Sequence, residues 1–354
     1  MTTTQADLGQ RLQAVDEAVE RLLPTLPQFK GLYDMFRYHV GWLDRSLRRV
    51  EGPEGKKLRP TLCLLVADTL GEGWRLAVPA AAAVELVHNF SLVHDDIEDG
   101  SPLRRHRDTV WAAWGMPQAI NVGDAVLVLA QRALAEAEKL PPEVGLSALR
   151  LLNQACLGLC EGQYLDLLWE REASVTAEQY LEMIERKTAR LFQCAAELGA
   201  LCSGASAEAQ RQAALFGSGL GMAFQAVDDL LGVWAPEHQT GKTELDLASR
   251  KKSLPAVLGL AASPSPDADR FRALFGLDRQ LSRDETSEAR RLLDNLGIHE
   301  QASAYARRYH DEALDHLAHP AVRDRAAPLI EFAETTLGEA YEGRISDSTE
   351  LQTK

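Results

Sequence analysis

Two acidic segments carry the side chains best suited to chemistry. HDDIED spans His94–Asp99, and FQAVDDLLG spans Phe224–Gly232. Asp95 and Asp99 are four residues apart, so on a helix they lie one turn apart on the same face. Like charges at that spacing destabilise an isolated helix. A hard divalent cation such as Mg²⁺, bound through carboxylate oxygens, would compensate for this repulsion.

An acidic helix face by itself is usually only solvated surface. Here apolar residues flank both segments, among them Phe90, Val93, Val227 and Leu230. Ionised carboxylates that emerge among apolar side chains are costly to desolvate unless a metal or a cation neutralises them. The two segments therefore favour a metal-binding cleft.

Short basic groups follow helix breaks elsewhere in the chain. The formal net charge is −14, so clustered cations in this protein indicate local anion sites. The alternative is solvated charge, or charge favoured by a helix end. Carboxylates for metal and separate cations for phosphate suggest a metal-chelated diphosphate opposite a second, directly bound diphosphate. The basic groups lie at residues 56–59, 104–105, 187–188, 241–242 and 251–252.

The helical period runs through the chain. Glycine and proline clusters separate the periodic segments, and Thr176-x-x-Gln179 has the form of a capping box. No linker divides the sequence, so we predict one all-α domain over residues 1–354, with flexible ends at about 1–6 and 347–354. Apolar residues recur at helical spacing through 8–23, 62–70, 80–97, 119–140, 146–168, 177–201 and 209–234.

The composition excludes several other classes of protein. The acidic excess argues against a broad surface for nucleic acid or anionic membrane. Proline and polar residues interrupt the apolar stretch at 76–93, so we interpret it as a buried helix and expect no transmembrane segment. The five cysteines lack metal-site spacing, and the start lacks the features of a secretory signal, so we expect a cytoplasmic protein.

Five motifs, in a fixed order over residues 56–255, resemble those of the trans-isoprenyl diphosphate synthase (polyprenyl synthetase) family. Five motifs in order are highly specific, whereas one alone would be weak. The resemblance implies a single-domain orthogonal helical bundle of the isoprenoid synthase type with a central active-site cavity. The motifs are GKKLRP, HNFSLVHDDIEDGSPLRR, GQYLDL, KTARLF, and FQAVDDLLG followed by TGK and DLASRKKSLP.

The resemblance also implies roles for individual residues. Asp95 and Asp99 would bind two Mg²⁺ ions that bridge the allylic diphosphate, and Asp228 would hold a third, with Asp229 and Asp246 in support. Three ions are therefore expected with substrate bound.

The direct ligands of the allylic diphosphate would be Arg104, Lys187 and Lys242. The pocket for isopentenyl diphosphate would consist of Lys56, Arg59, His88 and Arg105. The reacting ends would be stabilised by Thr188, Gln225 and Lys251, with Phe224 as a wall over the isopentenyl tail.

The activity implied is head-to-tail condensation by ionisation, condensation and elimination. The partners would be isopentenyl diphosphate and an allylic diphosphate (dimethylallyl, geranyl or farnesyl). The family is usually homodimeric through long helices, and the segment 119–140 is the interface helix that we expect. No nucleic acid is expected as a partner.

The sequence departs from the family pattern at three places, one of which is the absence of the usual glycine between Lys242 and Asp246. Gly232 replaces the third aspartate of the second acidic motif, which leaves that metal site dependent on Asp228. Arg105 is followed by His-Arg-Asp-Thr in place of the usual Gly-x-Pro-Thr, so we expect a loop of different shape there.

Product length depends on the channel below the first acidic motif. Phe90 is five residues before Asp95, which on a helix is about 7.5 Å lower at 1.5 Å per residue. A single bulky floor beside the small Ser91 resembles geranylgeranyl (C20) synthases, so we predict a C20 product. The alternative is that Phe90 is ordinary core.

Two other functions remain open at this point. A class I terpene cyclase on the same fold would also use Mg²⁺, but no Asn-x₃-Ser/Thr-x₃-Glu metal motif follows Asp228. A non-catalytic regulatory subunit of a heteromeric synthase would typically lack the aspartates that this chain retains.

Overall fold

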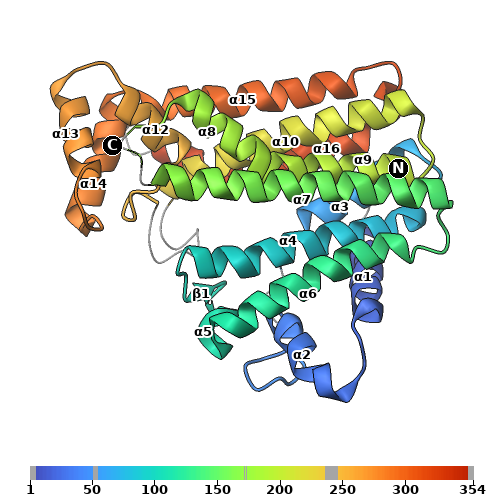
Figure 1. Ribbon diagram of the computed structural model, residues 1–354. Helices are drawn as coiled ribbons and strands as arrows, with labels where there is room; N and C mark the ends of the chain where they lie inside the picture. Colours follow the sequence, from blue (N-terminus) through green and yellow to red (C-terminus); the bar gives the residue numbers. More distant parts are fainter. Residues whose placement is uncertain (1–4, 51–54, 171, 173, 236–245, 350–354) are drawn as a thin grey trace. The chain divides into compact units, whose positions relative to one another are not determined.

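Nearly all regular structure in the described part of the chain is helical (Figure 1). The computed structural model describes residues 5–50, 55–170, 172, 174–235 and 246–349. The predicted all-α class is confirmed. The helices are α1 (Gln5–Leu22), α2 (Lys30–His39), α3 (Leu58–Leu70), α4 (Val78–Glu98), α5 (Val110–Trp114), α6 (Met116–Ala135), α7 (Pro142–Glu170), α8 (Ala177–Ile184), α9 (Arg190–Cys202), α10 (Ala207–Trp234), α12 (Leu254–Ala261), α13 (Pro266–Phe275), α14 (Arg283–Asn295), α15 (Ile298–Leu317) and α16 (Ala327–Thr349).

The internal contacts of the chain divide it into two compact units. The first unit comprises Met1–Cys156, Cys194–Ala214 and Pro320–Leu329, and the second comprises Leu157–Gln193, Leu215–His319 and Ile330–Lys354. Helices α7, α9, α10 and α16 contribute residues to both units. The single domain that we predicted over residues 1–354 stays a prediction.

Helix α4 is the central helix of the first unit. Helices α1, α3 and α6 pack against it, and α6 runs alongside it in Figure 1. Ala80, Ala81, Ala82 and Ala83 are fully buried, and side chains this small let neighbouring helices approach closely. By length and composition Trp74–Glu98 could cross a membrane, but 67% of its most apolar part is buried within the protein. Burial of that extent is typical of a core helix.

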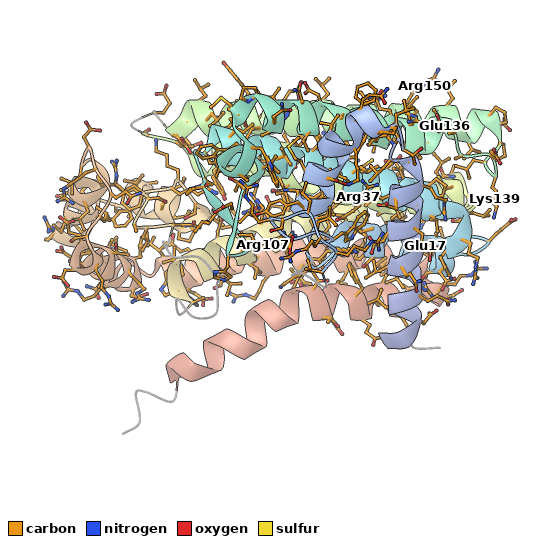
Figure 2. All side chains as sticks on the ribbon, turned by 90° about the horizontal axis from the view of Figure 1, so that it is seen from below. Glu17, Arg37, Arg107, Glu136, Lys139 and Arg150 are labelled. Carbon is orange, nitrogen blue, oxygen red and sulfur yellow. The ribbon has the colours of Figure 1, made fainter. Side chains whose placement is uncertain are left out.

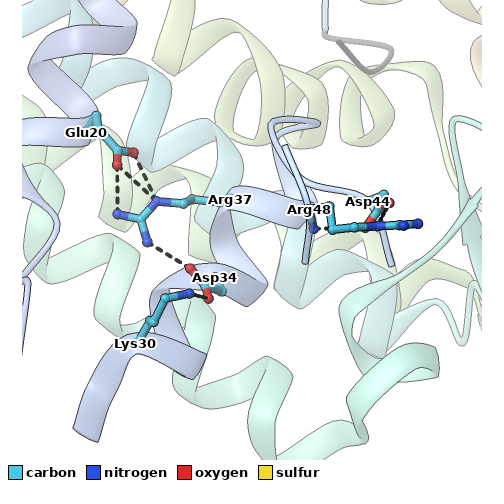
Figure 3. Close-up of polar contacts among 6 residues, drawn as sticks. All are labelled: Glu20, Lys30, Asp34, Arg37, Asp44 and Arg48. Carbon is cyan, nitrogen blue, oxygen red and sulfur yellow. Dashed lines mark hydrogen bonds and ion pairs between the residues drawn. The ribbon is translucent and has the colours of Figure 1, made fainter. Parts of the chain in front are cut away.

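A network of ion pairs connects α1 to α2 (Figure 3). Arg37 donates hydrogen bonds to both carboxylate oxygens of Glu20, at 2.8 to 3.1 Å. Asp34, which is buried, accepts from Arg37 at 3.0 Å and from Lys30. A bidentate guanidinium–carboxylate pair holds orientation as well as distance, so these contacts fix the end of α2 relative to α1.

A short hairpin follows α4 and carries the basic pair at 104–105. Strands β1 (Leu103–Arg104) and β2 (Arg107–Asp108) are antiparallel, and the two residues between them, Arg105 and His106, both have positive φ. Two consecutive left-handed residues are what a two-residue hairpin turn requires, although they are usually glycine or asparagine. Arg107, labelled in Figure 2, stacks over the ring of Tyr38 and donates to the carbonyl of Leu43. The segment that departs from the family pattern therefore forms a tight turn whose second strand contacts α2.

In the second unit, α8, α13 and α15 pack against α12. The predicted capping box at the start of α8 is confirmed, because Thr176 Oγ1 accepts from Gln179 N–H and Gln179 Oε1 accepts from Thr176 N–H. The helical period predicted an uninterrupted helix over 177–201. The structure instead contains a π-helical turn, Glu185–Ala189, between α8 and α9. Such turns insert one extra residue into a helix and are frequent at functional sites.

Candidate active site

The first acidic motif lies at the C-terminal end of α4, in the first unit. Asp99 is the C-cap residue, and its N–H donates to the carbonyl of Asp95 at 2.8 Å, so the helical spacing of the two residues is kept. Asp99 is exposed and Asp95 is half-buried. Their carboxylates therefore leave the helix end on one face, as the sequence predicted.

Asp96, between these two aspartates, has a different role that sequence reasoning missed. It is almost fully buried, and Arg104 binds both of its oxygens through Nε at 2.9 and 3.1 Å. Burial raises the pKa of Asp96, and the hydrogen bonds and charge of Arg104 oppose that rise. Asp96 thus holds Arg104 on the hairpin beside the end of α4. The sequence signal that could have indicated this role is the adjacent pair Asp95-Asp96. Two consecutive residues of a helix point in different directions, so only one of the two carboxylates can lie on the exposed face.

The predicted isopentenyl diphosphate residues also lie in the first unit. Arg59 Nη1 is 3.4 Å from His88 Nε2, so α3 and α4 bring these two side chains together. The guanidinium of Arg105 lies against Gly55, where a Cβ would be only 3.1 Å from Arg105 Cζ. Lys56 is exposed in the same segment. The hairpin and the segment before α3 therefore meet at Arg105.

The pKa values around these residues report a strongly positive site. Burial lowers the pKa of Arg59 to about 10. Burial, followed by the charge of Arg59 and of the hairpin arginines, lowers the pKa of His88 well below its usual range. His39, at the end of α2, was not singled out from the sequence, yet burial and three hairpin arginines lower its pKa to about 3. Both imidazoles are neutral at pH 7, and clustered shifts of this kind are typical of functional sites.

Replacing His39 by glutamine should reduce the loss of stability in acid. The folded pKa of about 3 lies below the ordinary 6.5, so the unfolded chain binds the extra proton and wild-type stability falls as the pH falls below 6.5. Between pH 7 and pH 5 the wild type should lose about 2 kcal/mol more than His39→Gln. Denaturant unfolding at both pH values measures this, with His106→Gln, which removes an exposed imidazole, as the control. Identical pH curves for wild type and His39→Gln would contradict the prediction.

In the second unit the π-helical turn presents Lys187 and Thr188. Lys187 Nζ binds Asp166 Oδ2, on α7, at 2.5 Å. Two glycines allow neighbouring helices to approach the turn: a Cβ on Gly162 would lie 2.7 Å from Lys187 Cα, and one on Gly221 would lie 2.7 Å from Ala189 Cα. The spacing of α7 and α10 around the turn therefore depends on the absence of side chains at these positions.

A buried hydrogen-bond network extends from this turn. Thr188 Oγ1 donates to Gln225 Oε1 at 2.9 Å, and Gln225 Nε2 donates to Asp229 Oδ1 at 3.0 Å. Asp229 Oδ2 accepts from the hydroxyl of Tyr180 and from Leu254 N–H. Burial raises the pKa of Asp229 to about 6, against the effect of these donors. Asp229 thus fixes α8, α10 and the start of α12 relative to one another, which the sequence alone did not predict.

Asp228, the neighbour of Asp229, is an exposed residue of α10. Its carboxylate is therefore accessible to a metal, whereas that of Asp229 is occupied by hydrogen bonds. The ring of Phe224 lies 5.4 Å from that of Phe192, and Lys251 is exposed with its N–H bonded to the carbonyl of Asp246. Lys242 lies outside the described residues.

The predicted site residues therefore fall into two groups, one in each unit. The first unit holds the first acidic motif, the hairpin arginines and the Arg59–His88 pair. The second unit holds the π-helical turn, the Asp229 network and the exposed Asp228. The carboxylates can bind a hard divalent cation, and the basic side chains can bind phosphate. On an all-α scaffold, this combination is typical of helical enzymes that act on diphosphates through a divalent metal.

Comparison with known proteins agrees with this class. The model of the polyprenyl synthetase family matches residues 40–293. The chain is 40% identical over 324 residues to the (2E,6E)-farnesyl diphosphate synthase of Mycobacterium tuberculosis, covering 89% of each chain. It is 35% identical over 345 residues to the geranylgeranyl diphosphate synthase of Methanosarcina mazei, covering 96% of this chain and 99% of the other. The crystal structure of a polyprenyl synthetase from Streptomyces coelicolor superposes with a TM-score of 0.84 at 37% identity, covering 93% of this chain and 96% of the other.

The chain belongs to the polyprenyl synthetase family, and its fold is the all-α isoprenoid synthase fold. It is a trans-prenyltransferase, whose substrates are isopentenyl diphosphate and an allylic diphosphate. The family uses a divalent metal. The donors fit such a metal, because Mg²⁺ is usually held by one or two carboxylates together with substrate phosphates.

Proposed function

We propose that this protein condenses an allylic diphosphate with isopentenyl diphosphate head-to-tail to give geranylgeranyl diphosphate (C20). The observation that carries the condensation chemistry is the positive field in the first unit, where His39 and His88 are held neutral beside Arg59 and the hairpin arginines. Such a site is suited to a diphosphate, whose charge the arginines can neutralise through paired hydrogen bonds. A cavity in the same unit is lined by Gly55, Lys57 and Arg105 among others.

The metal ligands that we propose are Asp95, Asp99 and Asp228, which would hold three Mg²⁺ ions when substrate is bound. The bound metal would neutralise the diphosphate as it leaves the allylic group. Asp96 keeps Arg104 beside the first acidic motif, where the guanidinium can bind the same diphosphate. Lys187 stands on the π-helical turn, and Lys242 is assigned to the same diphosphate by the family motif alone.

The remaining residues act on the reacting ends. Thr188 and Gln225 are joined by a hydrogen bond and held by Asp229, so their oxygens form a fixed polar surface in the second unit. Fixed dipoles of this kind stabilise a developing allylic cation without reorganisation. Lys251 is exposed at the edge of the same unit. We assign Lys56, Arg59, His88 and Arg105 to the diphosphate of isopentenyl diphosphate, and Phe224 to its tail.

Incubation of the purified protein with Mg²⁺, isopentenyl diphosphate and farnesyl diphosphate tests the activity directly. A C20 diphosphate is the expected product, sized by chromatography. A cyclic hydrocarbon without elongation would indicate a terpene cyclase. Neither an elongated nor a cyclic product would indicate a regulatory subunit and would overturn the proposal.

The C20 assignment rests on Phe90. Its side chain is buried within the first unit, and its ring meets the ring of His94 edge-on at 5.6 Å. Ser91 is also buried, with its hydroxyl donating to the carbonyl of His88 at 2.8 Å. A rigid ring about 7.5 Å below Asp95, at 1.5 Å of helical rise per residue, is suited to stop a growing chain.

Replacing Phe90 by alanine should lengthen the product beyond C20. Removing a buried ring leaves a cavity that costs about 3 to 5 kcal/mol of stability. Phe90→Leu therefore accompanies it as a milder variant, with a smaller shift to longer products. Chromatography of dephosphorylated products measures the length distribution. Unchanged product length in both variants, with elongation still active, would contradict the C20 assignment.

We also infer a cytoplasmic homodimer. All five cysteines are free thiols, as expected in a reducing compartment. Helix α6 exposes large apolar side chains at Met116, Ile120 and Val128. A row of this kind on one helix is suited to a helix of a second copy.

Replacing both Ile120 and Val128 by aspartate should convert the dimer to a monomer. Two buried charges at an apolar interface are costly to desolvate. Light scattering after size exclusion measures the mass. An unchanged mass for the variant would contradict an interface at α6.

A further inference from the structure

Lys251 and Lys252 are adjacent in the chain but lie in different environments. The sequence grouped them as one candidate anion site. In the folded protein Lys251 is exposed, whereas Lys252 is half-buried. The ammonium group of Lys252 donates to the carbonyl of Trp169 at 2.6 Å and to the carbonyl of Glu172. Two of its three donors are thus bound to backbone oxygens, which sets Lys252 apart from a phosphate ligand.

The carbonyls that Lys252 binds lie at the end of α7, which ends at Glu170. The last carbonyls of a helix have no partner within it, and a lysine side chain can supply one. The helix dipole also favours a cation at this end. Burial lowers the pKa of Lys252, and the charges of Glu172 and Glu170 oppose that change. Lys252 therefore joins the end of α7 to a segment 83 residues further along the chain than Trp169.

The segment that carries Lys252 is also bonded to other helices of the second unit. Arg250 Nη1 donates to the carbonyl of Phe275, the last residue of α13, at 3.1 Å. Leu254 N–H donates to Asp229 Oδ2, on α10, at 2.8 Å. These two bonds hold the segment against α13 and α10, and the ammonium of Lys252 holds it against α7. The distance between the segment and α7 therefore depends on Lys252.

The same end of α7 holds another basic residue of the candidate site. Asp166, about one helical turn before Trp169, binds Lys187 on the π-helical turn. Lys187 and the segment that carries Lys251 are thus both bonded to the last turns of α7. Their spacing is set through one helix end.

We propose that Lys252 is a positioning residue, which holds the segment of Lys251 against the end of α7 and so keeps Lys251 at a fixed distance from Lys187. This inference rests on the proposed function, in which Lys251 stabilises the reacting ends. Lys252 itself touches no substrate and acts only through Lys251. Without its ammonium the segment shifts, and a small displacement of a group beside the reacting atoms is enough to slow the chemical step.

Steady-state kinetics with Mg²⁺, farnesyl diphosphate and isopentenyl diphosphate tests this role. Lys252→Met, which keeps a long side chain without its charge and donors, should lower kcat about tenfold and leave KM for both substrates unchanged. Lys252→Arg should restore most of the lost kcat, because a guanidinium can donate to the same two carbonyls. The double variant Lys251→Met/Lys252→Met should be no slower than Lys251→Met alone, because the two residues act as a unit.

Arg272→Met is the matched control. Arg272 Nε donates to the carbonyl of Leu260 at 3.0 Å, and its Nη2 donates to the carbonyl of Ala262. Arg272 thus binds carbonyls at the end of α12 as Lys252 does at the end of α7, in the same unit and outside every motif assigned to the site. Arg272→Met should lower Tm as much as Lys252→Met does and keep the kcat of the wild type.

Hydrogen–deuterium exchange of the protein without substrate or metal tests the contact itself. Lys252→Met should speed the exchange of backbone amides at residues 165–170 and 246–254, because both segments lose a shared attachment. Lys252→Arg should restore slow exchange in both segments. Arg272→Met should leave the exchange at residues 165–170 unchanged.

The outcomes separate the inference from the proposed function. Wild-type kcat in Lys252→Met, or an equal fall of kcat in Arg272→Met, would overturn the positioning role. A double variant slower than Lys251→Met by about a further tenfold would show that Lys252 acts independently of Lys251, and would also overturn it. Unchanged exchange in Lys252→Met would overturn the attachment to α7. A wild-type protein that makes no elongated product would instead overturn the proposed function, while the exchange measurement would still decide whether Lys252 holds the two segments together.

Discussion

Replacing Asp228 by alanine should lower kcat by about a thousandfold and leave Tm unchanged, if stabilisation of the leaving diphosphate depends on this carboxylate. Asp228 is exposed on α10, and a substitution at the surface usually changes the free energy of unfolding by no more than about 0.5 kcal/mol. Loss of a metal ligand, by contrast, removes charge stabilisation in the transition state. Steady-state kinetics with farnesyl and isopentenyl diphosphates at saturating Mg²⁺, together with thermal unfolding, measures both effects.

Asp278→Ala is the control for this variant. Asp278 is also an exposed aspartate of the second unit, and it lies outside every motif that we assign to the site. It should retain wild-type kcat and Tm. Wild-type turnover by Asp228→Ala would contradict the assignment of Asp228 as a metal ligand, and a fall in its Tm would show that its role is structural.

Replacing Asp229 by alanine should lower the free energy of unfolding by about 3 kcal/mol. The substitution leaves three donors without their acceptor: the hydroxyl of Tyr180, the N–H of Leu254 and the amide of Gln225. Tyr180 and the carboxylate are buried, so water cannot readily replace the lost bonds. Denaturant unfolding of the metal-free protein measures the change.

Asp229→Asn and Asp228→Ala are the matched variants for this measurement. Asparagine keeps one acceptor oxygen, so Asp229→Asn should lose less stability than Asp229→Ala. Asp228→Ala removes the neighbouring carboxylate with no loss of stability. If Asp229→Ala unfolds at the same denaturant concentration as Asp228→Ala, the buried network does not hold the helices together. The two adjacent aspartates would then be equivalent, contrary to their positions.

The helical period was sufficient to predict most of the fold. Segments such as 80–97 and 119–140 correspond closely to α4 and α6, because an apolar stripe at helical spacing has few other ways to be buried. The period could not reveal the π-helical turn at Glu185–Ala189, since one extra residue in a long helix changes the pattern very little. It also missed the hairpin at 103–108, whose two-residue strands are too short to show alternation.

From the sequence, the candidate site could be predicted only as a set of residues of suitable chemical type. The structure shows that these residues lie in different environments. Adjacent aspartates in each motif divide into one that is buried and bound, Asp96 or Asp229, and one that is less buried. The sequence could not distinguish them, because hydrogen-bond partners such as Arg104 and Tyr180 are distant along the chain. His39 was missed for the same reason: its pKa is lowered first by burial and then by arginines on a hairpin, and only folding brings these about.

Family membership, the all-α class and the likeness of the two acidic motifs to metal-binding segments could all be established from the order of residues, because they depend on local spacing. The tertiary structure decided which carboxylates are held inside the protein and which are accessible, because burial depends on residues from several helices. It also changed the meaning of Gly232. In the sequence Gly232 is a missing aspartate, whereas in the folded protein the carboxylate of Asp246 occupies its side-chain space, and only three-dimensional packing can bring those two residues together.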